Sequence, residues 1–162
     1  MSMGMFRGMV ANQWIAKPYL SWSEVKCSCG QCDGGVLQAA IVPVFLAIRE
    51  EYRRISGADF GLWVSSGVRC AYKNRLVSKS EKSRHIEGDA LDIIPTARTP
   101  EALERVLPFD VFREICDRAN PTGGVGAYPD WRKGSITGGC HIDARGHEAR
   151  WIFTEGKRHP WV

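Results

Sequence analysis

SRHIEGDALDII, residues 83–94, combines a histidine, a glycine turn and a short apolar strand that contains a carboxylate. The apolar run around Asp92 predicts a strand, which Pro95 ends. Gly88 can reverse the chain, so that His85 folds back toward Asp92. An unpaired carboxylate in this apolar setting would be costly to desolvate. We therefore expect a cation beside Asp92.

A second histidine, with a carboxylate two residues later, occurs in HID, residues 141–143. We expect a neighbouring strand here, in which His141 and Asp143 point to one face. A hydrolytic zinc site has three protein ligands and one open position, and imidazole and carboxylate suit it. The sequence therefore predicts a zinc site made by His85, Asp92 and His141. Asp143 would either orient His141 or contact the zinc-bound water.

The order of the expected elements indicates an α+β fold: a single domain with an antiparallel sheet and flanking helices. Residues 36–55 carry apolar side chains at helical spacing, and Pro43 should kink this helix or mark a second start. The other expected elements are a strand at 60–69, a loop or short helix at 71–87, a strand at 89–94, helices at 101–107 and 109–119, and strands at 125–128, 140–144 and 150–153. We divide the chain into an irregular N-terminal arm (1–26), the domain (27–155) and a C-terminal tail (156–162).

Length and composition limit the class of protein. The 162 residues suffice for one compact domain, and 44% hydrophobic with 25% charged residues excludes wholesale disorder, collagen and coiled coil. No apolar run approaches the ~20 residues of a membrane span. A net charge of only +4 argues against a nucleic-acid-binding module. We therefore expect neither nucleic acid nor a membrane as a partner.

The N-terminus, MSMGMFRGMV, lacks the apolar core of a secretory signal peptide. We expect a protein that stays in the bacterial cytoplasm, or a phage-encoded one that reaches its site through lysis or virion assembly.

Three of the six cysteines form the cluster CSCGQC, at Cys27, Cys29 and Cys32. Such a cluster indicates a metal or free thiols in a reducing compartment, and disulfides in an oxidising one. The spacing lacks the paired C-x2-C halves of a zinc ribbon. We therefore favour a disulfide or free thiols over a structural zinc that Cys70 would complete.

The pattern S-x-H-x2-G-x-A-x-D from Ser83 to Asp92, followed by H-x-D at 141–143, resembles a known family. It is similar to the zinc D-alanyl-D-alanine carboxypeptidases and related peptidoglycan endopeptidases, among the hedgehog-like metallopeptidases. The resemblance covers about residues 20–153 in order, and residues 83–93 are its most specific part. The other matching segments are CSCG at 27–30, SSGVRC at 65–70 with Lys73 and Asn74, GVGAYP at 124–129, and Trp151.

This resemblance implies a role for each matching residue. His85, Asp92 and His141 correspond to the zinc ligands of the family. Arg69 corresponds to an arginine that holds a substrate carboxylate or carbonyl oxygen, for which a planar guanidinium is well suited. Ser83 corresponds to a residue near the substrate, although a hydroxyl that caps a turn is an equal alternative.

The general base is where the chain departs from better-known relatives. Those relatives carry an acid three residues before the second histidine, or a histidine two residues before it. This chain has Gly138 and Gly139 at those positions. Asp143 is therefore the first candidate for the base, and Glu87 is the second.

Two functions remain open. The first is zinc-dependent hydrolysis of peptide bonds in peptidoglycan stem peptides, as a carboxypeptidase or endopeptidase. The short form without a wall-binding repeat fits a phage lysis or virion-associated enzyme. The alternative is a catalytically weak or inactive virion protein that keeps the fold and contacts other virion proteins. The missing upstream acid favours this alternative.

Overall fold

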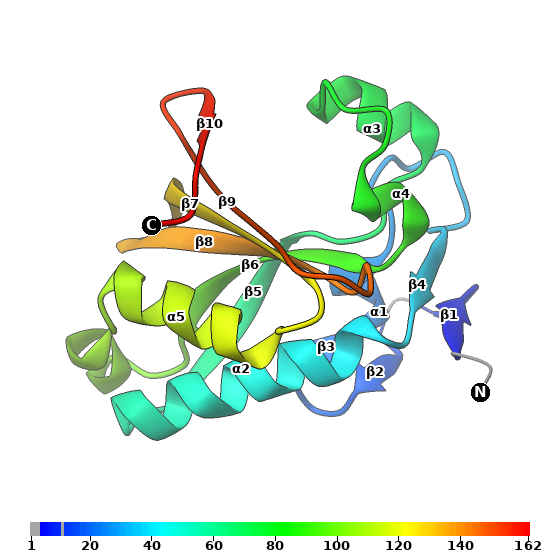
Figure 1. Cartoon of the computed structure of the whole chain (residues 1–162). Helices are drawn as coiled ribbons and strands as arrows, with labels where there is room; N and C mark the ends of the chain where they lie inside the picture. Colours follow the sequence, from blue (N-terminus) through cyan, green and yellow to red (C-terminus); the bar gives the residue numbers. More distant parts are fainter. Residues whose placement is uncertain (1–3, 11) are drawn as a thin grey trace.

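The computed structural model describes residues 4–10 and 12–162. Its largest unit is a six-stranded sheet in the order β10-β9-β7-β8-β6-β5 (Figure 1). The strands are β5 (Phe60–Ser66), β6 (Ala90–Ala97), β7 (Gly124–Lys133), β8 (Ile136–Asp143), β9 (Ala149–Thr154) and β10 (Lys157–His159). A single domain with a sheet and flanking helices confirms the predicted α+β class.

The expectation of a wholly antiparallel sheet is wrong at one pair, because β7 and β9 run parallel. The cause is the path of the chain. β8 ends at Asp143, beside Gly124 at the start of β7. A short connection then brings Ala149 to the free side of the same Gly124. Strand β9 therefore starts at the same end as β7 and runs in the same direction.

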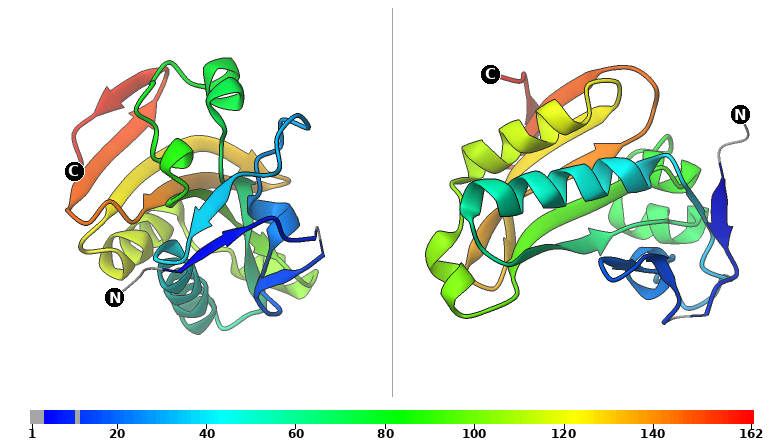
Figure 2. Two further views of the ribbon diagram at one scale, coloured as in Figure 1. Left: turned by 90° about the vertical axis from the view of Figure 1, so that its right-hand side faces the viewer. Right: turned by 90° about the horizontal axis from the view of Figure 1, so that it is seen from below.

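Two helices cover one face of the sheet. They are α2 (Ile41–Ser56) and α5 (Phe109–Ala119), which lie side by side in the right panel of Figure 2. Helix α2 buries one large apolar or aromatic residue per turn, at Ile41, Phe45, Ile48 and Tyr52. The Tyr52 hydroxyl accepts a hydrogen bond from the Leu107 N–H at 2.9 Å, after the 3-10 helix η1 (Glu101–Arg105). This face therefore holds the core.

Pro43 marks a start of the helix. Residues before it form strand β4 (Val36–Gln38), and Pro43 lies in the first turn of α2. A proline is tolerated there because the first N–H groups of a helix have no partner within the helix.

Strand β6 does not end at Pro95 as expected. It continues to Ala97, with Pro95 opposite Leu62 of β5. Pairing between β6 and β8 ends earlier, at Ile93 and Cys140. Beyond Ile93, no further pairing of β6 with β8 is found among the described residues, so Pro95 interrupts no ladder on that side.

The N-terminal segment is not the irregular arm that the sequence suggested. It contains β1 (Met5–Arg7), β2 (Trp14–Ala16), β3 (Leu20–Ser21) and α1 (Trp22–Val25), and β1 pairs with β4. Leu20, Trp22 and Val25 are fully buried. Part of this expectation falls on residues 1–3 and 11, which lie outside the described residues. Such short elements have too few residues to show a hydrophobic period.

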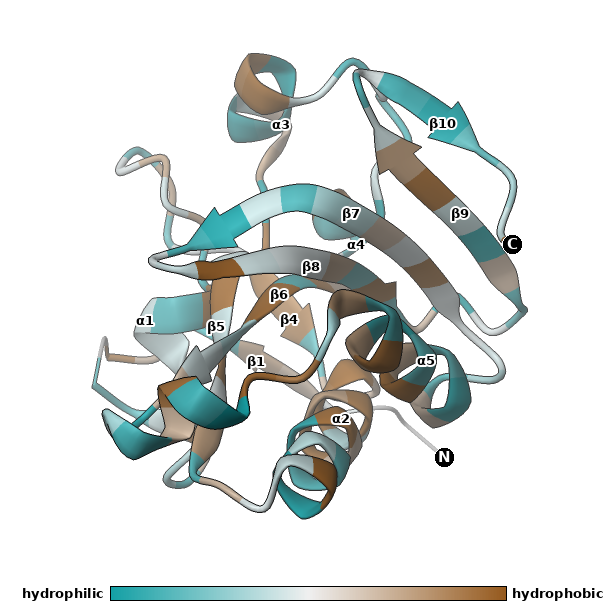
Figure 3. Cartoon of the chain, turned by 90° about the vertical axis from the view of Figure 1, so that its left-hand side faces the viewer, coloured by the Kyte–Doolittle hydropathy of each residue, from teal (hydrophilic) through white to brown (hydrophobic). Residues whose placement is uncertain are grey.

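The opposite face of the sheet carries two short helices, α3 (Ala71–Val77) and α4 (Arg84–Glu87), seen above the sheet in Figure 1. They occupy the segment where a loop or short helix was expected. At the C-terminus, β10 adds an exposed edge strand that is hydrophilic along its length (Figure 3). Among the described residues, no helix combines the length and apolar character needed to cross a membrane.

Candidate metal centre

Three buried donor side chains meet on the face of the sheet that carries α4. His85 comes from α4, Asp92 from β6 and His141 from β8. Their potential ligand atoms all lie within 4.8 Å of one another. Asp92 Oδ1 is 3.1 Å from His85 Nε2 and 3.0 Å from His141 Nδ1. The structure thus brings together the three residues that the sequence singled out.

Local structure explains how these residues converge. Asp92 and His141 stand directly opposite each other in the antiparallel ladder of β6 and β8, so both point to one face. The Ser83 side chain caps α4 and accepts a hydrogen bond from the His85 N–H at 3.3 Å. Gly88 ends α4 with a φ of +76°, and the Val36 carbonyl fills the place where a Cβ would stand. Only glycine allows this reversal, which returns the chain from His85 into β6.

The far nitrogen of each imidazole faces a group that can only accept a hydrogen bond. His85 Nδ1 is 2.6 Å from the Gly67 carbonyl oxygen, and His141 Nε2 is 2.8 Å from Asp143 Oδ2. These nitrogens therefore carry the protons. In neutral imidazoles, the lone pairs of His85 Nε2 and His141 Nδ1 then both face Asp92 Oδ1. Because lone pairs facing a carboxylate repel it, this donor set fits a cation placed between the three groups.

The electrostatics of the site agree with this fit. Burial alone would raise the pKa of Asp92, but the two neighbouring imidazoles hold that pKa well below its usual range. Burial alone would lower the pKa of His141, but hydrogen bonds to Asp143 and Asp92 raise it to about 9. Both shifts show that the site favours positive charge beside Asp92.

Asp143 is fully buried and surrounded by donors of its own chain. It accepts hydrogen bonds from the Gly124 N–H at 3.0 Å, from Arg145 Nε at 2.8 Å and Nη2 at 2.6 Å, and from His141 Nε2. Burial alone would raise the pKa of Asp143, but the bonds from Arg145 and His141 hold it far below its usual range. Of the two roles predicted for Asp143, this geometry favours orienting His141 over contacting water.

Arg69 joins the site from the segment after β5. Its Nη2 lies 3.2 Å from Asp92 Oδ2, and its Nε donates to Ser66 Oγ at 2.9 Å. A pocket of about 320 Å³ adjoins this pair and is also lined by Lys73. A larger hollow of about 550 Å³ lies toward the end of β6, around 96–100 and 133–136, and none of the donor residues line it. The pocket beside Arg69 is the one relevant to the site, because Arg69 both lines it and contacts Asp92.

The other candidates from the sequence are placed differently. The Ser83 hydroxyl acts as a helix cap, the alternative that the sequence left open. Glu87 is exposed at the end of α4.

Sequence reasoning missed the role of Arg145, and it noted Trp151 and the segment 124–129 only as part of the resemblance, without a role beside His141. Arg145 holds Asp143, and the Trp151 ring lies 5.3 Å from the His141 ring and donates to the Tyr128 hydroxyl at 3.3 Å. Gly126, opposite His141 in the ladder, leaves the space that the Trp151 ring fills. The spacing of Asp143 and Arg145, two residues apart, is the one signal that could have indicated their contact.

Two imidazoles and one carboxylate around one point, each supported from behind, define the ligand set of a mononuclear metallohydrolase. The family model described as Peptidase M15 matches residues 18–124. The chain belongs to this family of metallopeptidases, which confirms the resemblance seen in the sequence. The matched segment contains Arg69, His85 and Asp92 and ends before His141. No curated protein and no solved structure matches the chain.

Proposed function

We propose that the protein is a zinc-dependent peptidase that cleaves peptide bonds in peptidoglycan stem peptides. One observation carries the proposal: two imidazoles, each with its far nitrogen anchored, direct their free nitrogens to Asp92 in a chain of the Peptidase M15 family. His85, Asp92 and His141 would hold the ion. A bound zinc would polarise the peptide carbonyl and lower the pKa of a water molecule toward ~7.

The residues around the ligands prepare the site for this chemistry. The Gly67 carbonyl fixes the ring of His85, and Asp143 with Arg145 fixes the ring of His141. Ligands that are held in advance lose less freedom when the ion binds, and they keep one coordination position directed to the substrate. In this proposal Asp143 is a positioning residue, which revises its expected role as the general base.

Arg69 is the group that would recognise the substrate. Its guanidinium lies between Asp92 and the pocket lined by Ser66 and Lys73. A stem peptide ends in a carboxylate. The guanidinium of Arg69, in a pocket that is also lined by the cationic Lys73, suits such a group. An oxygen of the substrate bound there would place the adjoining peptide bond next to Asp92, as a carboxypeptidase or an endopeptidase requires.

The test is metal analysis combined with two activity measurements. His85→Ala and Asp92→Ala should each remove the zinc of this site, because a ligand is lost from a set of three. The unaltered protein should release D-alanine from stem peptides or lower the turbidity of a peptidoglycan suspension, and both variants should fail. A protein that binds zinc at this site but does neither is not a peptidoglycan hydrolase.

That last outcome would support the second candidate, a virion protein that keeps the fold and contacts other virion proteins. A specific observation favours it. A Cβ at Gly138 would meet the Phe109 ring, and one at Gly139 would meet the Trp131 ring. The structure therefore has no room for a side chain at either of the two positions where better-known relatives carry a catalytic acid or histidine. A phage origin fits both candidates.

A further inference from the structure

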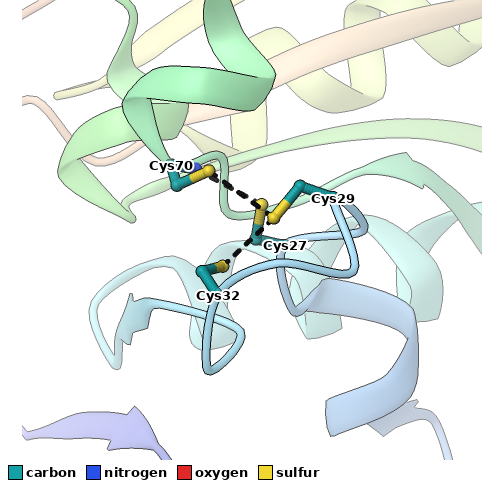
Figure 4. A group of neighbouring side chains, drawn as sticks. All are labelled: Cys27, Cys29, Cys32 and Cys70. Atoms are coloured by element: carbon teal, nitrogen blue, oxygen red, sulfur yellow. Dashed lines mark hydrogen bonds between the residues drawn. The ribbon is translucent and has the colours of Figure 1, made fainter.

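A second group of metal-binding side chains lies outside the proposed catalytic site. Cys27, Cys29 and Cys32 come from the loop between α1 and β4, and Cys70 comes from the N-terminus of α3 (Figure 4). All four sulfur atoms lie within 4.8 Å of one another. In Figure 4 the four side chains point toward a common centre from two separate segments of the chain.

The distances between these sulfurs identify the arrangement. Cys29 Sγ lies 3.4 Å from Cys32 Sγ and 3.7 Å from Cys70 Sγ. A disulfide requires about 2.05 Å, so these atoms are not bonded. A tetrahedral zinc with Zn–S bonds of about 2.3 Å separates its sulfurs by about 3.8 Å. These two sulfur–sulfur distances are therefore close to the separation between sulfurs in a tetrathiolate metal site.

Backbone hydrogen bonds give independent support. Each of the four sulfurs accepts an N–H: Cys27 from Cys70 at 3.4 Å, Cys29 from Gln31 at 3.3 Å, Cys32 from Gly34 at 3.4 Å, and Cys70 from Lys73 at 3.4 Å. Metal ligands carry such outer hydrogen bonds as a rule, and thiolates need them because their charge must be stabilised. All four sulfurs therefore have a backbone donor placed to stabilise a thiolate.

We propose that Cys27, Cys29, Cys32 and Cys70 bind a second zinc ion in a closed, structural site. Four thiolates complete the tetrahedral coordination and leave no open position for water. The site has no part in hydrolysis. It goes against the preference for a disulfide or free thiols that the sequence suggested, because the folded chain brings in Cys70 as the fourth ligand.

The thiolate site lies next to the segment that supports two ligands of the catalytic site. Cys70 follows a segment in which Gly67 holds His85 and Arg69 holds Asp92. The same segment is tied to α1, since the Val68 N–H donates to the Val25 carbonyl at 2.7 Å. A metal that joined Cys70 to the cysteine loop would fix the position of this segment. The thiolate site would therefore stabilise the groups that support two of the three catalytic ligands.

The experiment uses zinc as the probe and the full chain, purified with a phosphine reductant. His141→Ala removes a ligand of the catalytic site, so that the zinc content of this variant measures binding at the thiolate site. We expect about one zinc per chain in this variant, with an X-ray absorption spectrum that fits four sulfurs at about 2.3 Å. Adding Cys32→Ser should release that zinc, whereas Cys32→His should retain it, because imidazole replaces thiolate in Cys3His sites.

Ser28→Ala is the matched control, since Ser28 is exposed in the same loop between two of the ligands. It should leave the zinc content unchanged. If Cys32→Ser does not fold, the unaltered protein decides: its zinc absorption spectrum should contain both sulfur and nitrogen or oxygen shells. A His141→Ala variant without zinc, or a zinc spectrum without sulfur, would overturn the proposal. A spectrum with sulfur alone would leave it standing and count against the catalytic site instead.

Discussion

Replacing Asp143 with asparagine separates its two candidate roles. The carboxylate receives donors on both oxygens: Oδ1 from the Gly124 N–H and from Arg145, and Oδ2 from His141 and from Arg145. An asparagine replaces one oxygen with a donor. The arrangement that breaks fewer bonds puts the amide nitrogen at the Oδ2 position, opposite His141 Nε2 and Arg145 Nη2. His141 would then lose the partner that orients it.

The magnitude follows from these contacts. A buried donor left without a partner costs about 1–3 kcal/mol, and two are left here, so we expect the free energy of unfolding to fall by about 2–6 kcal/mol. Loss of an outer hydrogen bond to a ligand histidine weakens metal binding by about 10–100-fold. The assay is urea unfolding of the metal-free protein, together with chelator competition for zinc. The competition is measured in a Cys32→Ser background, in which zinc binds only at the catalytic site.

The opposite pattern would refute the positioning role. A general base contributes about 10²-fold or more to turnover without holding the metal. If Asp143→Asn keeps its stability and zinc affinity but loses turnover on that scale, Asp143 is the base. Asp143→Ala is the matched variant, because it removes the acceptor without adding a competing donor, and it should weaken zinc binding at least as much.

Three further predictions concern pH, the turn and the arginine. The pKa of His141, raised from 6.5 to about 9, means that the metal-free fold gains stability from its protonation that is complete below pH 6.5. The melting temperature of metal-free protein should therefore fall as the pH rises from 6.5 to 9, and a His141→Gln variant that kept the same slope would contradict this. Gly88→Ala should lower the free energy of unfolding by about 2–4 kcal/mol in urea titrations, because it adds a clash with the Val36 carbonyl to a positive φ. Gly134→Ala, also at positive φ but with nothing within 4 Å of its Cβ, should cost only about 1 kcal/mol, and equal losses would show that the clash is unimportant. Arg69→Lys should retain zinc but lower kcat/KM by about 10–100-fold in D-alanine release, because a lysine cannot pair two oxygens in one plane; an unchanged kcat/KM would remove Arg69 from substrate binding.

The candidate site was accessible from sequence because its geometry is local. Asp92 lies seven positions after His85, and glycine at position 88 is needed for the reversal between them. His141 required one further assumption, that its strand lies beside that of Asp92, and the ladder of β6 and β8 fulfils it. Strand periodicity then placed Asp143 on the same face. These steps use only turn chemistry and the alternation of side chains along a strand.

Features that depend on distant parts of the chain could not be derived in this way. The parallel position of β9 depends on where β8 ends relative to β7, and the continuation through Pro95 depends on where the pairing of β6 with β8 stops. Neither feature can be recognised from the residue pattern of the segment in which it occurs. Arg145 was missed because a charged residue in a loop is usually solvated, whereas here the buried Asp143 gives it a partner.

The cysteine cluster shows the same limit with a larger consequence. The spacing of Cys27, Cys29 and Cys32 argued against zinc because a second C-x2-C pair is missing. The fold replaces that pair with Cys70, which also caps α3 by accepting the Lys73 N–H. Because the chain between Gly67 and Cys70 is so short, a displacement at the sulfurs would be transmitted to His85 and Asp92. Loss of the structural metal should therefore weaken zinc binding at the catalytic site, whereas emptying the catalytic site should leave the thiolates loaded, since four cysteines hold their ion without any group from it.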